Sequence, residues 1–336
     1  MSVACRVILS ACVSLSIASS ALADERAAGS EAKPQFVIIS FDGAHDIAQW
    51  QRSRTLAART GARFTYFLSC VFLLSRETRR EYQAPGMGPG KSNVGFAQSK
   101  REVANRLGQI RLAAAEGHEI ASHACGHFDG GGWSKDDWLK EFASFRHILR
   151  DAYSINGIAG EPADWRAFAD NAIHGFRAPY LETGDGLYSA LKTAGFAYDA
   201  SGISRGPVEP EAGSVERFSL PQIPEGPKAR RVIAMDYNLF VRHSGGFERP
   251  DEAAAFQERS YEAFKAAFDT QYSGKRVPLQ LGFHFTLMND GAYWKALERF
   301  AEEVCVKADV VCTSYDDYLA RTGAAGSKPE GNTAGG

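Results

Sequence analysis

Short apolar runs rich in β-branched and aromatic residues alternate with longer helix-like segments along most of this chain. The runs that favour strands are 36–41, 63–69, 119–123, 175–178, 197–200, 232–237, 280–285 and 310–313. The segments that favour helices are 47–60, 100–115, 135–151, 186–194, 252–270, 293–304 and 315–321. A strand–helix unit that repeats seven or eight times is typical of a parallel sheet. At 336 residues we therefore expect an α/β fold whose seven to eight parallel strands close, or nearly close, into a barrel.

The two ends of the chain differ in composition from the part that we expect to fold. Arg6 precedes an apolar run at 7–18, and Ala21-Leu22-Ala23 then gives the small-x-small pattern at which signal peptides are cleaved. The last residues are rich in Gly, Ala and Ser, a composition that favours disorder. The expected divisions are a signal peptide at 1–23, a folded domain at 34–321 and a disordered tail at 322–336.

A signal peptide predicts export, to the periplasm or outside the cell. One alternative is a lipoprotein, because Leu9-Ser10-Ala11-Cys12 resembles a lipoprotein box with Cys12 as the lipidated residue. The apolar run continues past Cys12, which favours ordinary cleavage instead. The run is also too short to span a bilayer, so we expect no transmembrane anchor. The formal net charge of −2 lacks the basic excess of nucleic-acid-binding proteins, so we expect no nucleic acid as partner.

Removal of residues 1–23 leaves four cysteines, namely Cys70, Cys125, Cys305 and Cys312. An even number in an oxidising compartment favours disulfides. Cys305 and Cys312 are the favoured pair, because they would tie the end of a helix to the strand that follows it. Cys70 and Cys125 each lie just beyond an expected strand, where they form either a second bridge or two buried thiols.

Four chemically active side chains fall at or just beyond the C-terminal ends of four expected strands: Asp42, His123, Arg177 and His284. The catalytic groups of α/β barrels gather at this end of the strands. Asp42 follows a buried run and suits a general base that deprotonates water. Arg177 suits its partner, although an ordinary structural ion pair gives the same pattern. His284 suits a general acid, or else a core histidine between two phenylalanines.

His123 and His127 lie four residues apart in the turn after a strand, where both can reach one divalent ion. Neutral imidazoles suit zinc, with cobalt or nickel as alternatives. His118 begins the strand and is expected to be structural. The backbone N–H of Tyr180 is expected to point at a developing oxyanion, and Asp199 to tune the charge of His284.

Three connections, at 76–99, 128–133 and 201–230, are longer than simple barrel loops. Loops of this length at one rim of a barrel shape a substrate groove or only cover the rim, and both interpretations stay open.

Four fragments occur in a fixed order along the chain. They are Ser40-Phe41-Asp42-Gly43, His123-Ala124-Cys125-Gly126-His127, Arg177-Ala178-Pro179-Tyr180 and Leu281-Gly282-Phe283-His284. They resemble, in that order, the motifs T-F-D-D-G, H-S/T-x-x-H, R-x-P-Y and L-x-x-H of the polysaccharide deacetylases of carbohydrate esterase family four. The resemblance runs over about 34–319, and Asp136-Asp137-Trp138 makes it closest to the chitin-deacetylase branch.

The resemblance implies a distorted (β/α) barrel, a divalent metal and hydrolytic removal of acetyl groups from N-acetylated sugars. The roles that it implies are base for Asp42, metal ligands for His123 and His127, orientation of the base for Arg177, and general acid for His284. Aromatic residues at the rim would stack on sugar rings, and the candidates are Tyr82, Trp133 and Tyr180.

One departure from the family pattern concerns the metal. The second Asp of the first motif, which is the third metal ligand of the family, is Gly43 in this chain. Asp46 would restore a His-His-Asp set, with His45 as the other candidate. Alternatively, water fills the position and the affinity for the metal falls.

The sequence thus predicts an exported, metal-dependent hydrolase that removes acetyl groups from an N-acetylglucosamine-containing polymer such as chitin or peptidoglycan. Two alternatives stay open. One is a carbohydrate-binding relative that lost the chemistry at Gly43. The other is a deacetylase that acts on an O-acetyl ester or on a non-sugar amide.

Overall fold

A nine-stranded, largely parallel sheet forms the centre of the protein, which a computed structural model describes at residue 1 and at residues 33–323. The expected signal peptide and the tail beyond residue 323 lie outside the described residues. The strands are β1 (Gln35–Gly43), β2 (Thr65–Leu68), β3 (Glu119–Ser122), β4 (Gly175–Phe176), β5 (Tyr198–Ser204), β6 (Glu216–Glu225), β7 (Arg230–Ile233), β8 (Leu279–His284) and β9 (Val310–Thr313). The α-helices are α1 (Ile47–Thr60), α2 (Lys100–Ala115), α3 (Lys135–Ile155), α4 (Trp165–Asn171), α5 (Asp185–Ala194), α6 (Asp236–Ser244), α7 (Ala253–Tyr272), α8 (Ala292–Val304) and α9 (Tyr315–Thr322).

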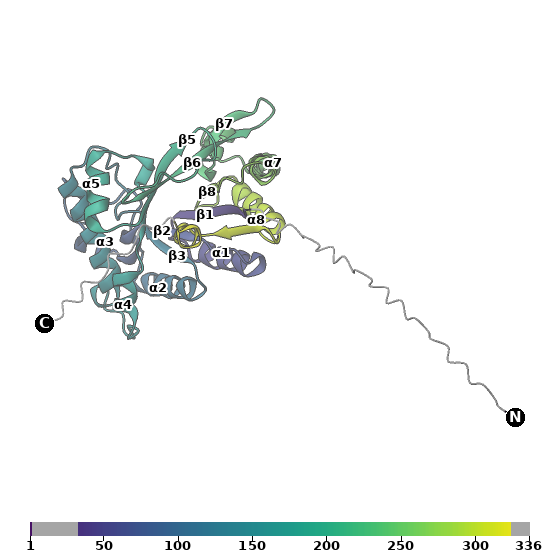
Figure 1. Ribbon diagram of the computed structural model, residues 1–336. Coiled ribbons are helices and arrows are strands. Elements are labelled where there is room, and N and C mark those ends of the chain that lie inside the picture. Colours follow the sequence, from purple (N-terminus) through teal and green to yellow (C-terminus); the bar gives the residue numbers. More distant parts are fainter. Residues whose placement is uncertain (2–32, 324–336) are drawn as a thin grey trace. The chain divides into compact units, whose positions relative to one another are not determined.

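The sheet curls into an incomplete barrel. Its strands follow the order β7-β6-β5-β4-β3-β2-β1-β8, with β9 paired to β1 beside this path. All of these pairs are parallel except β6 with β7. An isolated bridge between Met235 and Gly282 brings the chain after β7 back to β8. The distorted (β/α) barrel that the sequence predicts is therefore confirmed, with an antiparallel hairpin at one end of the sheet (Figure 1).

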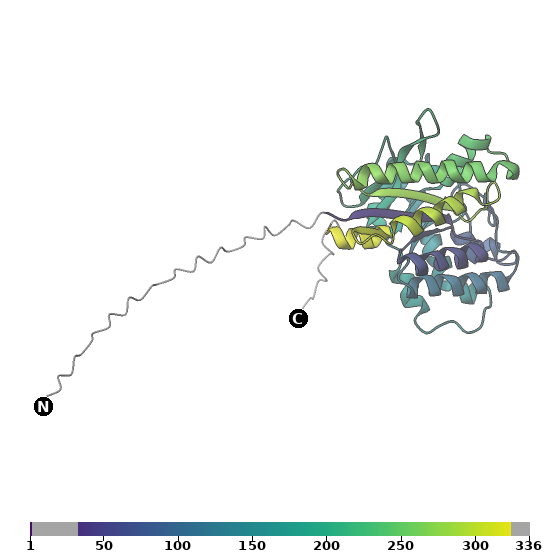
Figure 2. The same ribbon diagram turned by 90° about the vertical axis from the view of Figure 1, so that its right-hand side faces the viewer.

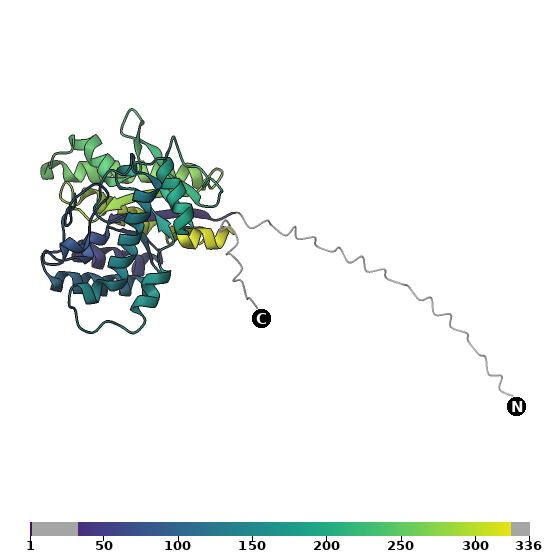
Figure 3. The ribbon, with the colours of Figure 1, turned by 90° about the vertical axis from the view of Figure 1, so that its left-hand side faces the viewer.

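Helices cover the outside of the curled sheet. Helices α7, α8, α1 and α2 pack in that order along one flank (Figure 2), and α3 packs against α4 and α5 on another (Figure 3). The starts of α1 and α2 were predictable, because Asp46 and Ser99 accept the backbone N–H groups of Gln49 and Glu102 as N-caps. No helix within the described residues has the length and apolar character needed to cross a membrane.

The structure differs from the predicted elements in three places. The connection over 201–230 contains the strand β6, although Pro221 and Pro224 argue against a strand there. A proline lacks the backbone N–H, but its carbonyl can still accept a hydrogen bond from the next strand. The carbonyl of Pro221 accepts the N–H of Ala234 at 2.9 Å. The predicted strand 232–237 ends at Ile233, and α6 begins at Asp236. Helix α4 was not predicted.

Two disulfides tie elements together. Cys305–Cys312 confirms the pair that the sequence favours, and Cys70–Cys125 is the second bridge. The latter joins the residues after β2 to those after β3, so it fixes the chain that contains His123 and His127.

Candidate active site

A pocket of about 500 Å³ opens at the C-terminal ends of the strands. Asp42 and His284 lie beside each other at the ends of β1 and β8, and His123 follows β3. The residues that line the pocket are Asp42, His123, His127, Tyr180, Tyr237, Asn238 and His284, with an apolar wall of Val94, Ala178, Leu181, Ile203, Ile233 and Met235. The sheet thus brings both predicted proton-transfer groups and both predicted metal ligands to one cavity.

Asp42 is almost completely buried and is held by Arg177. The Nη1 atom of Arg177 donates to Asp42 Oδ1 at 2.8 Å and to the Ser40 hydroxyl at 2.8 Å. Its other nitrogens donate to the Tyr315 hydroxyl and to the carbonyl of Ala200, and its guanidinium lies over the ring of Phe67. Burial by itself would raise the pKa of Asp42, but the charges of Arg177, His123 and His284 and the hydrogen bond from Arg177 together outweigh it, so the pKa falls below its ordinary value. Asp42 is therefore an ionised carboxylate whose second oxygen is available to water.

His284 forms a hydrogen-bonded pair with a carboxylate that the sequence analysis missed. Its Nδ1 atom lies 2.7 Å from Asp236 Oδ1, and its backbone N–H donates to Asp236 Oδ2 at 2.7 Å. Burial would lower the pKa of His284, but Asp236, with help from Asp42, raises it above the ordinary value. Because Nδ1 binds Asp236, Nε2 is the nitrogen of the ring that is left to donate a proton into the pocket.

Asp236, and not Asp199, is the carboxylate that acts on the charge of His284. Asp199 accepts a hydrogen bond from the Ser201 hydroxyl, which in turn accepts the N–H of Ala178. Asp199 is absent from the pocket lining, and burial raises its pKa to about 6. The sequence does contain a signal for Asp236, because this carboxylate directly follows the apolar run 232–235. The predicted strand 232–237 placed Asp236 inside a strand and so concealed that signal.

His123 and His127 present neutral imidazoles. The Nδ1–H of His123 donates to the carbonyl of Arg177 at 2.8 Å, which leaves the Nε2 lone pair available. The two ring centres lie 4.9 Å apart. Burial lowers the pKa of His123 to about 3 and also lowers that of His127. The buried Nδ1 of His127 has no hydrogen-bond partner among the described residues. Neutral imidazoles with an unbonded ring nitrogen can coordinate a metal ion.

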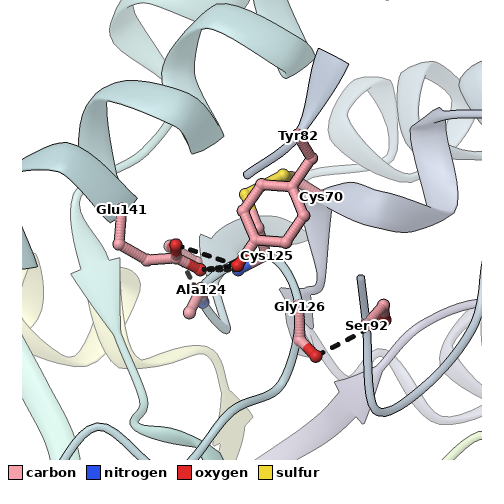
Figure 4. Close-up of a disulfide and its surroundings, with 8 residues drawn as sticks. Cys70, Tyr82, Ser92, Ala124, Cys125, Gly126 and Glu141 are labelled. Carbon is pink, nitrogen blue, oxygen red and sulfur yellow. Dashed lines mark hydrogen bonds between the residues drawn. A yellow bond between two sulfur atoms is a disulfide. The ribbon is translucent and has the colours of Figure 1, made fainter. Parts of the chain in front are cut away.

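The turn that carries these two histidines is braced by the contacts of Cys125 (Figure 4). Cys125 lies between them and is bonded to Cys70, and its N–H donates to Glu141 at 2.8 Å. Ala124 and His127 have φ values of 56° and 55°, in the left-handed region that costs a non-glycine residue energy. The brace therefore holds a strained turn. Sequence could have indicated Glu141, because it lies on the apolar face of α3 between Trp138 and Phe142.

The structure corrects the predicted sugar-stacking residues. Tyr82 is 0% exposed, because its ring is enclosed and its hydroxyl donates to Glu141 at 3.0 Å. Trp133 is half-buried against Trp138, with ring centres 4.8 Å apart, and does not line the pocket. Tyr180 is at the pocket, is 56% exposed and lies against the ring of His127. Tyr180 is therefore the one of the three that lines the pocket.

Asp46 does not supply a third metal ligand in this structure. Its side chain accepts the N–H of Gln49 at 2.9 Å as the N-cap of α1, and it is absent from the pocket lining. The ring of His45 lies against Phe72 instead. Within the described residues, no group of three or more His, Cys, Asp or Glu side chains is placed to hold a metal. The donors present therefore fall short of the three protein ligands of a catalytic zinc site.

Replacement of Asp46 by Ala tests whether Asp46 is a helix cap or a metal ligand. We expect an unchanged affinity for zinc and a loss of about 1 kcal/mol in the free energy of unfolding, because an N-cap is removed. Zinc titration and chemical denaturation measure the two effects. A loss of zinc binding with unchanged stability would return Asp46 to the metal site.

Known proteins resemble this chain in sequence and in fold. The chain is 34% identical over 224 residues to chitin deacetylase 1 of Bombyx mori, a match that covers 60% of this chain and 38% of the relative. The chain thus spans about two fifths of the length of that curated relative. Among solved structures, a candidate polysaccharide deacetylase of Mycobacterium smegmatis superposes with a TM-score of 0.52 at 18% identity, over 89% of this chain and 96% of the other. A polysaccharide deacetylase homologue of Pseudomonas aeruginosa gives a TM-score of 0.52 at 15% identity, over 86% and 91%. No protein-family model matches the chain.

Proposed function

Because the chain is a polysaccharide deacetylase-like protein, we propose that it hydrolyses acetyl groups from an N-acetylglucosamine-containing polysaccharide of the chitin or peptidoglycan type. One observation carries the proposal. The carboxylate of Asp42 and the imidazole of His284 occupy paired positions on adjacent strands and face one pocket. Their partners favour the ionised form of the first and the protonated form of the second, which are the forms needed for a base and an acid.

The proposed reaction uses both groups in one turnover. Asp42 takes a proton from water as the water oxygen bonds to the acetyl carbon. His284 donates the proton on Nε2 to the amide nitrogen, and the C–N bond breaks to release acetate and a free amine. Arg177 keeps Asp42 ionised and oriented, and Asp236 does the same for the imidazolium of His284. The N–H of Tyr180 is our candidate for the hydrogen bond to the oxyanion, because Tyr180 lies at the pocket.

Zinc is the first ion to test, with cobalt and nickel as alternatives. We propose His123 and His127 as its ligands, since both present neutral imidazoles to the pocket. No step above is assigned to a metal, because the third donor is missing among the described residues. With two protein ligands we expect zinc to be lost on dialysis.

The function is tested by the release of acetate. The chain is dialysed, its zinc content is measured, and it is incubated with acetylated chitin oligomers with and without added zinc or cobalt. Acetate release supports the deacetylase, and its dependence on the added ion decides the metal question. Acetylated xylan is the matched ester substrate, and release from it alone would assign O-acetyl esters instead.

A second candidate function follows from Gly43, which leaves the two imidazoles without a third ligand. It is a carbohydrate-binding relative that keeps the pocket without the chemistry. Binding of chitin oligomers without acetate release, with any of the three ions, would support it. For either function we propose an exported protein, on the basis of the signal-like segment at 1–23.

A further inference from the structure

A second pocket, of about 270 Å³, lies beside the β6–β7 hairpin and has a strongly basic lining. Its charged residues are Glu225, Lys228, Arg230, Arg242 and Arg259. Four cations and one carboxylate give this small cavity a formal charge of +3, whereas the whole chain has a net charge of −2. The concentration of positive charge is therefore local to this part of the fold.

The single carboxylate of this basic pocket is already bonded. Glu225 is 4% exposed and accepts hydrogen bonds from Arg259 Nε at 2.9 Å and from His243 Nε2 at 3.0 Å. Arg242 donates to the carbonyl of Arg231, which fixes its position and leaves its charge uncompensated. Lys228 and Arg230 are exposed, and no carboxylate of the described residues lies within salt-bridge distance of either. The pocket therefore has cationic side chains that are available to an anion.

The basic pocket adjoins the candidate active site through two elements. Strand β7 contributes Arg230 to the basic pocket and Ile233 to the wall of the active-site pocket. On α6, Asn238 lines the active-site pocket, and Arg242, one turn further on the same face, lines the basic pocket. One helical turn separates them by about 6 Å along the axis. The hairpin lies at the end of the curled sheet (Figure 1). Because α6 lines both pockets, a polymer that extends from the active-site pocket along α6 would reach the basic pocket.

We propose that the basic pocket binds an anionic group, a carboxylate or a phosphate, of the acetylated glycan whose acetyl group occupies the active-site pocket. The inference rests on the proposed function and narrows its substrate class to acetylated glycans that are anionic. The guanidinium groups of Arg230 and Arg242 offer paired N–H donors that match both oxyanions, and Lys228 adds a point charge. A neutral polymer such as chitin leaves these cations without a partner.

The test compares the binding of two acetylated oligomers to the full chain by calorimetry. Hyaluronan oligomers carry a carboxylate on every second sugar, and chitin oligomers of equal length carry none. At low salt we expect hyaluronan to bind about tenfold more tightly, the effect of two exposed ion pairs. The preference should shrink as salt is raised, because salt screens exposed charges.

Lys228→Ala combined with Arg230→Ala should remove the preference and leave chitin binding unchanged. The matched control is Lys275→Ala combined with Lys307→Ala, which removes two cations just before β8 and β9, at the opposite ends of the strands. Equal affinity of the unmodified chain for both oligomers overturns the proposal, and so does a preference that survives in the Lys228 and Arg230 variant.

Inorganic phosphate and acetate, as competitors of hyaluronan, identify the anionic group. Stronger competition by phosphate assigns a phosphate, and stronger competition by acetate assigns a carboxylate. If neither anion competes with hyaluronan for the unmodified chain, the result counts against an anion site. Acetate release is followed separately. A salt-sensitive preference without acetate release would mean that the proposed hydrolysis fails while the anion pocket stands.

Discussion

Replacement of Asp42 by Asn is expected to lower the rate of acetate release about 10²- to 10⁴-fold, the usual contribution of a general base. The amide has nearly the same shape as the carboxylate, so the pocket is kept, but it cannot take a proton from water. Because the variant also leaves Arg177 buried without its counterion, we expect a loss of about 3 kcal/mol in the free energy of unfolding. Rates are therefore measured well below the melting temperature, with binding of chitin oligomers as evidence that the pocket is intact.

Asp199→Asn is the matched control for this variant. It removes another buried carboxylate, on strand β5, without a change to the pocket lining. We expect it to affect stability while the rate of acetate release stays within a few-fold of that of the unmodified chain. A rate for Asp42→Asn equal to that of this control would remove Asp42 from the reaction.

Replacement of Asp236 by Asn should change both the rate and its dependence on pH. His284 must be protonated to act as an acid, and Asp236 raises its pKa above the ordinary value. In the unmodified chain, activity is therefore lost as pH rises through this raised pKa. Without the carboxylate, burial lowers the pKa of His284, so the alkaline limb of the profile should move to lower pH. The rate at neutral pH should fall about 10²-fold or more, because the amide favours a neutral imidazole.

The acid side of the profile gives an internal control for Asp236→Asn. It reports the ionisation of Asp42, whose pKa is lowered by Arg177, and we expect activity to persist down to the acidic range of that group in both proteins. Movement of the acid limb alone would contradict the pairing of Asp236 with His284. An unchanged profile with a uniformly lower rate would give Asp236 a purely structural role.

Sequence was sufficient where the signal is local. The starts of α1 and α2 follow from Asp46 and Ser99, because an N-cap depends only on the next three residues. The positions of Asp42 and His284 follow from the apolar runs that end beside them. The same local logic failed at β6, because prolines that argue against a strand are tolerated near the edge of the sheet.

The unpredicted parts of the site depend on contacts between distant residues. Asp236 and Asp199 both follow apolar runs, and only the packing of α6 against β8 decides which of them meets His284. Tyr82 lies in a long polar loop, so exposure was expected, yet the burial of Glu141 requires a hydroxyl donor beside it. Asp46 suits both a metal ligand and a helix N-cap by its residue type, and only the fold shows that it caps α1.

The disulfide beside the two histidines makes the geometry of the pocket depend on the redox conditions under which the protein folds. Cys70–Cys125 is formed only where thiols are oxidised, and it crosses the base of the strained turn that carries His123 and His127. In a reducing compartment the same turn would be held by hydrogen bonds alone. There Asp42 and His284 would keep their places on β1 and β8, while the turn that carries His123 and His127 would lose its covalent brace. The redox state of the surroundings would therefore decide how firmly the two imidazoles are held relative to each other.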